Sequence, residues 1–294
     1  NLAGAYRKAG RLDEAIPLYE QTLKDRTRIL GHHHPDALAS RNNLAGAYQE
    51  AGRLEEAIPL YEQTLKDNTR ILGHHHPDPL LTRNNLAGAY RKAGRLDEAI
   101  PLFEQTLKDF ENLLGTNHPL TLTTQSNLAN AYCDAGRLDE AIPLFEQTLT
   151  DRTRTLGPNH SDTLLSSNNL AGAYWHAGRL DEAIPMFEQT LKDFENLLGT
   201  NHPLTLTTQD NLAIAYRTAG RLDEAIPLFE ETLEDFENLL GPNHPDTLTS
   251  RNNLADAYRA AGRAEEAEAL LETPSDSEDE QDGTEEDPDH TAGD

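Results

Sequence analysis

The sequence has little of several residue types, and each shortage excludes a class of protein. Its single cysteine, Cys133, excludes an internal disulfide and is typical of a reducing compartment, so we predict a cytoplasmic location. No apolar run approaches the roughly 18 residues that a membrane span needs. The 25 basic residues are outnumbered by 51 acids, giving a net charge of −26. Nucleic acids and anionic membranes require basic patches, so we predict neither as a partner.

The short motifs that carry common catalytic chemistry are also missing. There is no P-loop, no dinucleotide-binding glycine pattern, no Gly-x-Ser-x-Gly and no His-Glu-x-x-His. Acidic pairs such as Asp97-Glu98 recur at a helix start, where they complement the helix dipole. Cys133 stands beside Asp134, and a neighbouring carboxylate disfavours a reactive thiolate. We therefore predict that the chain is not an enzyme and needs no cofactor.

What the chain has instead is one motif at a fixed spacing. Asn-Leu-Ala-x-Ala-Tyr is followed by Ala-Gly-Arg-Leu-(Asp/Glu)-Glu-Ala-Ile-Pro in nearly every copy, and adjacent copies are 42 residues apart (85 − 43 = 42). A fixed period of this size indicates a stack of identical supersecondary units. The asparagine that opens each copy is Asn1, Asn43, Asn85, Asn127, Asn169, Asn211 or Asn253.

Each repeat predicts two helices. In the second repeat, Pro35 suits a first helical position and Gly52 a C-terminal cap. The next helix is predicted from about Leu54, with acids in its first turn, to just before Gly73. Since only a few residues separate the two helices, they form an antiparallel pair.

These positions resemble the tetratricopeptide repeat (TPR), and the longer repeat resembles the kinesin-light-chain subclass. The Leu-Gly-x-x-His-Pro-Asp connection at 240–246 and the Asn-Asn-Leu-Ala run at 252–255 carry the second resemblance. The resemblance implies an all-α, right-handed superhelical solenoid of antiparallel helix pairs, whose first helices line a concave protein-binding groove without catalysis. The matching large and small positions are Leu44, Ala45, Tyr48, Gly52, Ala57, Tyr61 and Thr64. The family's aromatic near the start of the first helix is replaced here by Arg41, Arg83, Gln125, Ser167, Gln209 and Arg251.

The domain organisation follows from the repeat. Residues 1–272 are predicted to form a seven-repeat solenoid, with a truncated first repeat and a more polar, cap-like last repeat. The missing first half of the opening repeat suggests a fragment of a longer protein. Residues 273–294 are predicted to be an acidic, disordered tail, because they have too little apolar surface to bury. We also consider that this tail folds back onto the groove.

Two sets of residues are candidates for ligand binding. By resemblance, the recurring asparagines Asn43, Asn85, Asn127, Asn169, Asn211 and Asn253 face the groove, where amides can hold a peptide backbone. The alternative is that they bridge neighbouring helices. The second set lies at the two positions just after the tyrosine, where the repeats differ most; it includes Trp175 and the cations Arg7, Lys8, Arg91, Lys92, Arg217 and Arg259. Their positive charge favours an acidic peptide, although drift on a solvated face predicts the same variation.

The histidines are the remaining candidates. His32-His33-His34 and His74-His75-His76 look like metal tracts, but later repeats keep only the last histidine. We therefore predict a structural role beside the helix start and no metal site, with metal capture by adjacent imidazoles as the alternative.

The function predicted is a protein- or peptide-binding scaffold. One version is the sensing arm of a larger bacterial regulator, with a nucleotide-triphosphatase domain fused outside this chain, because long, near-identical arrays of this subclass look similar to those in such proteins. Arginine is much commoner than lysine, which favours a GC-rich bacterial genome. The other version is a free-standing adaptor or a self-assembling module.

Overall fold

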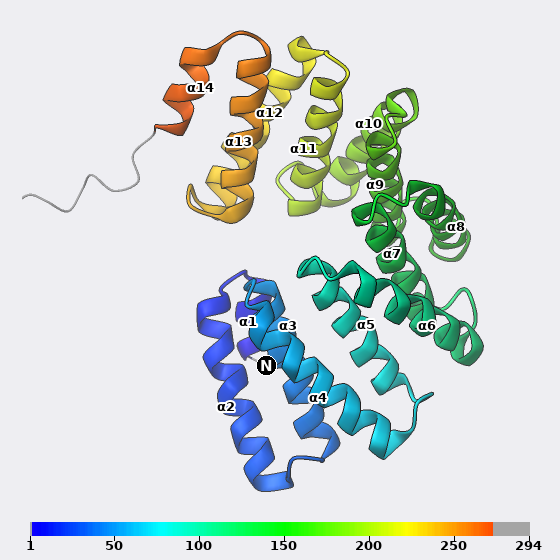
Figure 1. Cartoon of the computed structure of the whole chain (residues 1–294). Helices are drawn as coiled ribbons and strands as arrows, with labels where there is room; N and C mark the ends of the chain where they lie inside the picture. Colours follow the sequence, from blue (N-terminus) through cyan, green and yellow to red (C-terminus); the bar gives the residue numbers. More distant parts are fainter. Residues whose placement is uncertain (1, 273–294) are drawn as a thin grey trace, which may run out of the picture. The chain divides into compact units, whose positions relative to one another are not determined.

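The computed structural model describes residues 2–272, and every regular element there is an α-helix (Figure 1). The first helices of the repeats are α1 (Leu2–Lys8), α3 (Pro35–Glu50), α5 (Pro77–Lys92), α7 (Pro119–Asp134), α9 (Ser161–His176), α11 (Pro203–Thr218) and α13 (Pro245–Ala260). The second helices are α2 (Leu12–Leu30), α4 (Leu54–Leu72), α6 (Leu96–Leu114), α8 (Leu138–Leu156), α10 (Leu180–Leu198), α12 (Leu222–Leu240) and α14 (Ala264–Leu271). The predicted tail lies outside the described residues.

The chain divides into two compact units, one up to Asn211 and one from Leu212 onward, with the boundary inside α11. We call them unit 1 and unit 2 and describe each by itself. No helix of the described residues is long and apolar enough to cross a membrane.

The helix ends are formed by the residues that the sequence singles out. At α3, Pro35 occupies the first turn, and the His34 ring Nδ1 accepts a hydrogen bond from the backbone N–H of Asp36 at 3.2 Å. Gly52 follows α3 with φ +73°, and the next N–H, that of Arg53, donates to the carbonyl of Tyr48 at 2.8 Å. This is the Schellman arrangement, which favours glycine because its left-handed backbone has no Cβ to clash. The predicted structural role of the last histidine is confirmed.

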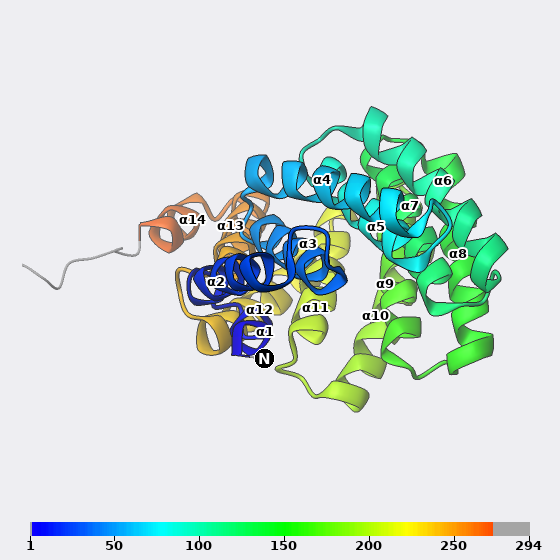
Figure 2. The ribbon, with the colours of Figure 1, turned by 90° about the horizontal axis from the view of Figure 1, so that it is seen from below.

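Consecutive helices pack against each other from α1 to α10, and a second set of contacts joins neighbouring first helices. α3 contacts α5, α5 contacts α7, and α7 contacts α9, whereas neighbouring second helices lie farther apart (Figures 1 and 2). Because the first helices are more closely spaced than the second, the stack in unit 1 curves toward them. The first-helix face is therefore the concave one.

The core alternates small and large residues. Ala45 and Ala57 are fully buried, while Tyr61 is only 2% exposed and Phe103, its equivalent in the next repeat, is 0% exposed. Alanine lets helix backbones approach, and the aromatic rings fill the remaining volume. The aromatic position of the second helix is thus core, as predicted.

A polar network ties each helix turn to the preceding repeat. The Tyr48 hydroxyl donates to Glu20 of α2 at 2.6 Å, and the Arg53 guanidinium lies over the Tyr48 ring at 4.4 Å. Arg53 in turn donates two hydrogen bonds to Glu56, at 2.6 and 2.7 Å. Burial, then the hydrogen bond to Glu20, raises the pKa of Tyr48 to about 12. We call this Tyr–Arg–Glu arrangement the turn network; within unit 1 it recurs at Tyr90, Tyr132 and Tyr174.

Candidate functional site

Two neighbouring cavities lie on the first-helix face of unit 1. The larger, about 330 Å³, is lined by residues that include Arg7, Asn43, Gly46, Glu50, Tyr61 and Lys92. The smaller, about 140 Å³, is lined by residues that include Asn85, Gly88, Arg91, Phe103 and Asn127. Gln49, Asn85 and Lys92 line both. We call the surface formed by the two cavities the groove surface; it includes five of the predicted ligand-binding residues.

Glycine opens the floor of each cavity. A Cβ on Gly46 would lie 3.3 Å from a guanidinium nitrogen of Arg7, and one on Gly88 would lie 3.5 Å from the Gln49 amide nitrogen. The equivalent position is again glycine at Gly4 and Gly172, and it is Asn130, Ile214 or Asp256 in the remaining repeats. Sequence reasoning missed these glycines as site residues, although the change from glycine to larger side chains at one fixed position was a usable signal.

Two of the recurring asparagines, Asn85 and Asn127, both line the groove surface and bridge repeats. Asn85 Nδ2 donates to Asn42 Oδ1 at 3.5 Å, and the same bond joins Asn127 to Asn84 at 3.3 Å. A third bond, from Asn211 to Asn168, measures 3.4 Å. All three are longer than a normal hydrogen bond of about 2.9–3.0 Å. The two interpretations of these asparagines are therefore compatible, because amides held this weakly keep capacity for a ligand.

The arginines of the groove surface are ion-paired across repeats. Arg7 donates two hydrogen bonds to Glu50 of the next repeat, at 2.7 and 2.6 Å, and this contact raises the pKa of the guanidinium above its usual range. Arg91 donates to Asp134, again of the next repeat, at 3.1 Å. Each arginine side chain is about one-third exposed, at 32% and 29%. These pairs weaken the attraction of Arg7 and Arg91 for the predicted acidic peptide, because both cations already have a counterion.

Unit 2 carries the other two predicted arginines, and both pair with one acid. Arg217 lies 3.7 Å from Asp256 and donates to the backbone carbonyl of Asn253 at 3.2 Å. Arg259 donates to Asp256 at 2.9 Å. Asp256 occupies the position that is Gly46 and Gly88 in unit 1, so the residue at this position of unit 2 supplies a counterion.

Trp175 and Cys133, each directly after the tyrosine of its repeat, lie farther along unit 1. The Trp175 side chain is half-buried, and its ring is 4.5 Å from that of His176. Cys133 is half-buried as well; burial and then the charge of Asp134 raise its pKa to about 11. The thiol is therefore mainly protonated at neutral pH, in agreement with the prediction that it is not a reactive nucleophile. Asn169 lies one turn before Gly172 on the same helix.

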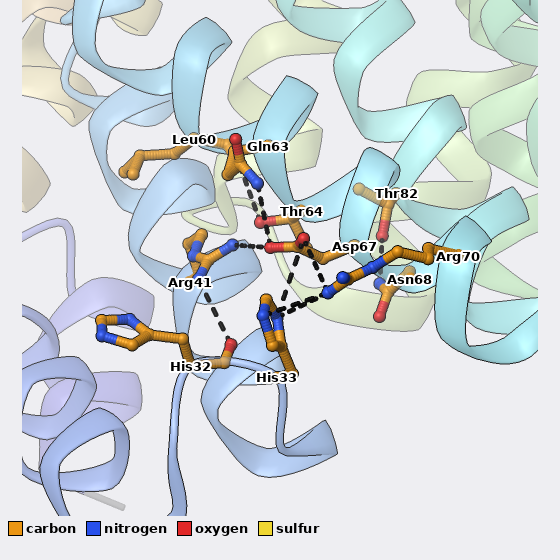
Figure 3. A network of polar contacts seen from close by, with 10 residues as sticks. All are labelled: His32, His33, Arg41, Leu60, Gln63, Thr64, Asp67, Asn68, Arg70 and Thr82. Atoms are coloured by element: carbon orange, nitrogen blue, oxygen red, sulfur yellow. Dashed lines mark hydrogen bonds and ion pairs between the residues drawn. The ribbon is translucent and has the colours of Figure 1, made fainter.

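Arg41, which replaces the family's aromatic residue, is held in a polar network at the loop before α3 (Figure 3). Its guanidinium is buried and donates to the equally buried Asp67 of α4 at 2.8 Å. His33 contacts the guanidinium of Arg70 at 3.0 Å and lies 3.8 Å from Asp67 (Figure 3). An ion pair between two helices of one repeat thus takes the place of ring packing. Within residues 2–272 no group of three or more potential ligands could hold a metal ion.

Comparison with known proteins agrees with this helix-pair architecture. The tetratricopeptide repeat model matches residues 1–68, 42–112, 78–154, 120–195, 162–238 and 213–273. The chain belongs to the tetratricopeptide repeat family. No curated protein matches its sequence.

Solved structures of TPR proteins refine the assignment. A putative kinesin light chain from Podosopora anserina, with nearly identical TPR-like repeats, is 34% identical at a TM-score of 0.59, over 70% of this chain and 98% of that one. BtubC (BKLC) from P. vanneervenii is 25% identical at a TM-score of 0.61, over 74% and 88%. This chain is therefore a TPR protein of the kinesin-light-chain type. The family's fold is generally a non-catalytic scaffold for protein interaction.

A third structure shares the fold alone. It is a signal-transduction ATPase with a tetratricopeptide repeat sensor from Pyrococcus horikoshii, 16% identical at a TM-score of 0.59. The match covers 92% of this chain but 40% of that one.

Proposed function

We propose that the TPR chain binds an extended segment of a partner protein along the groove surface of unit 1. The observation that carries the proposal is the pair of adjoining cavities lined by amides from three repeats. Each amide offers both a donor and an acceptor, so Asn43, Asn85 and Asn127 can pair with a peptide backbone whatever its sequence. The residues after the tyrosine differ between repeats and provide selectivity.

The test begins with peptides selected by the purified chain from a random display library. The best peptide is then titrated calorimetrically into the wild type and into Gly88→Ile, which fills the smaller cavity with a side chain that α11 already carries at Ile214. We expect the affinity to fall at least about tenfold, a cost of about 1.4 kcal/mol.

The matched control is Lys66→Ile, which adds the same side chain on an exposed position of the outer helix α4. It should leave the affinity unchanged. Equal binding by the wild type and Gly88→Ile, with both folded by circular dichroism, would overturn the proposal. The triple variant Asn43→Ala, Asn85→Ala, Asn127→Ala should weaken every selected peptide to a similar extent, because backbone contacts do not depend on sequence.

We further propose that the array serves as the sensing arm of a larger regulator with a fused nucleotide-triphosphatase domain, as the Pyrococcus protein combines a TPR sensor with an ATPase. A free-standing cytoplasmic adaptor and a self-assembling module are the alternatives. Sequencing the gene on either side of this segment separates the first from the second. Sedimentation at several concentrations tests the third, which requires a mass above that of a monomer.

A further inference from the structure

The charged residues of the groove surface follow a pairing rule between adjacent repeats. The residue directly after the tyrosine in one repeat contacts the second residue after the tyrosine in the next, 43 positions later. Arg7 contacts Glu50 in this way, and Arg91 contacts Asp134. Both contacts are ion pairs that neutralise an arginine on the concave face.

Between these two ion pairs, the rule leaves one cation without an anion. The corresponding residues are Gln49 and Lys92, at the same separation (92 − 49 = 43), and Gln49 carries no charge. Lys92 is exposed, lines both cavities, and has no ion-pair partner among residues 2–272. Its neighbours in the cavities include the amides of Gln49, Asn85 and Asn127.

We infer that Lys92 is the ligand-selecting cation of the groove surface, and that Glu50 and Asp134 withhold Arg7 and Arg91 from the ligand. The ligand is then an extended peptide with a single carboxylate side chain at Lys92, flanked by uncharged residues. This inference rests on the proposed function. It narrows the acidic peptide that the sequence favours to a peptide with one acidic side chain in this region.

The selectivity depends on what a ligand carboxylate must displace when it binds, which is a counterion at Arg7 and water at Lys92. A ligand carboxylate that approached Arg7 would have to displace the two charge-assisted hydrogen bonds from Glu50, so the exchange gains little. A ligand carboxylate that approaches Lys92 displaces only solvent. An ammonium group also accepts a carboxylate from many directions, whereas a guanidinium requires the bidentate geometry that Glu50 already occupies.

Neighbouring charges then limit the ligand to one acid in this region. A second acidic side chain, placed one repeat away in either direction, would approach Glu50 or Asp134 and be repelled. The carboxylate is assigned to a side chain and not to a chain end, because groove-surface amides lie on both sides of Lys92, at Asn43 and Asn127. A peptide can therefore continue past it in both directions.

The experiment repeats the library selection on four proteins: the wild type, Lys92→Gln, Glu50→Gln and Gly88→Ile. We expect wild-type peptides to share one Asp or Glu at a fixed position. Lys92→Gln should select peptides without it, and Glu50→Gln should select peptides with a second acid, because Arg7 is released. Enrichment of the same acid by Lys92→Gln would overturn the inference.

The measured affinities of the selected peptides then distinguish the possible outcomes. Replacing the shared acid by its amide should weaken binding to the wild type about tenfold, and to Lys92→Gln less than about twofold. Amidating the C-terminus of the synthetic peptide should change nothing; a loss there would overturn the assignment to a side chain. If Gly88→Ile selects the same peptides as the wild type, the proposed function itself fails. If only Lys92→Gln selects the same peptides as the wild type, the proposed binding along the groove surface is retained and the role assigned to Lys92 is wrong.

Discussion

The turn network and the groove surface are built from similar residues but have different roles. At the turns, Tyr90 donates to Glu62 of the preceding repeat and lies under Arg95, and equivalent contacts recur in the other repeats of unit 1. On the groove surface, the same arginine–carboxylate chemistry joins Arg7 to Glu50 but is absent between Gln49 and Lys92. The first region is identical from repeat to repeat, and the second is not.

The turn network holds the stack together, whereas the groove surface distinguishes one repeat from another. The tyrosine ring of the turn network is buried, so changing it alters packing between repeats. Groove-surface ion pairs are partly exposed, and such pairs contribute little to stability, so they can vary without unfolding the array. Each prediction below tests this separation.

The largest effect is expected from the buried ring. Tyr90 is 7% exposed. Replacing it by alanine should lower the free energy of unfolding by about 3 kcal/mol, because a large cavity is left between repeats. Tyr90→Phe removes only the hydrogen bond to Glu62 and should cost about 1 kcal/mol. Urea unfolding followed by circular dichroism measures both. A cost for Tyr90→Ala no greater than for Tyr90→Phe would contradict the assignment of the ring to the core.

A second large effect concerns Cys133, which occupies the position that is arginine in Arg7, Arg91, Arg217 and Arg259. Its pKa of about 11 means that the thiolate population at neutral pH is smaller by at least about tenfold than for an ordinary cysteine. Alkylation by iodoacetamide, followed by mass spectrometry, should be correspondingly slow and should accelerate as the pH rises toward 11. Asp134→Asn removes the neighbouring negative charge and should speed the reaction; an unchanged rate would show that burial alone controls it.

The turn network should also respond to alkaline pH. The folded-state pKa of Tyr48, Tyr90 and Tyr132 is about 12, above the ordinary value near 10. Their neutral form is favoured by folding, so this contribution to stability is complete below pH 10 and is lost as the pH rises through 12. Urea midpoints measured across this window should fall. The fall should be smaller in Tyr90→Phe, which has one ionisable group fewer, and an equal fall would exclude this tyrosine as a contributor.

The smallest difference is expected between two arginines close together in the chain. Arg95→Ala removes the ring contact and two hydrogen bonds to Glu98, whereas Arg91→Ala removes one exposed ion pair. The urea midpoint should therefore fall more for Arg95→Ala. A larger fall for Arg91→Ala would mean that the ion pairs of the groove surface stabilise the stack more than the turn network does.

The sequence was sufficient for the helices because their signals are local. Pro35, Gly52 and the acids after Leu54 act within one turn of their own position, and the structure places helix ends there. The capping histidines were predicted for the same reason. Comparison of repeats showed that only the last histidine is kept, and its ring accepts from the helix start.

The site was only partly predictable. The asparagines and variable positions were found by comparing repeats, and Asn43, Asn85, Asn127, Arg7 and Arg91 do line the cavities. The glycine floors were not found, and the sequence did not distinguish Lys92 from the other cations that follow the tyrosines. Both depend on which residue of one repeat lies against which residue of the next, and that register is set by how the helices pack.

By itself, the sequence determined the repeat, the two helices within it, their caps and the family, because each depends on residues close together in the chain. Only the tertiary structure decided which charges cancel. Arg7 and Lys92 are both cations that closely follow a tyrosine, yet Arg7 is held by Glu50 whereas Lys92 is exposed and lines a cavity with the uncharged Gln49. Electrostatic attraction depends on distance in space, and the pairs that matter lie a full repeat apart along the chain.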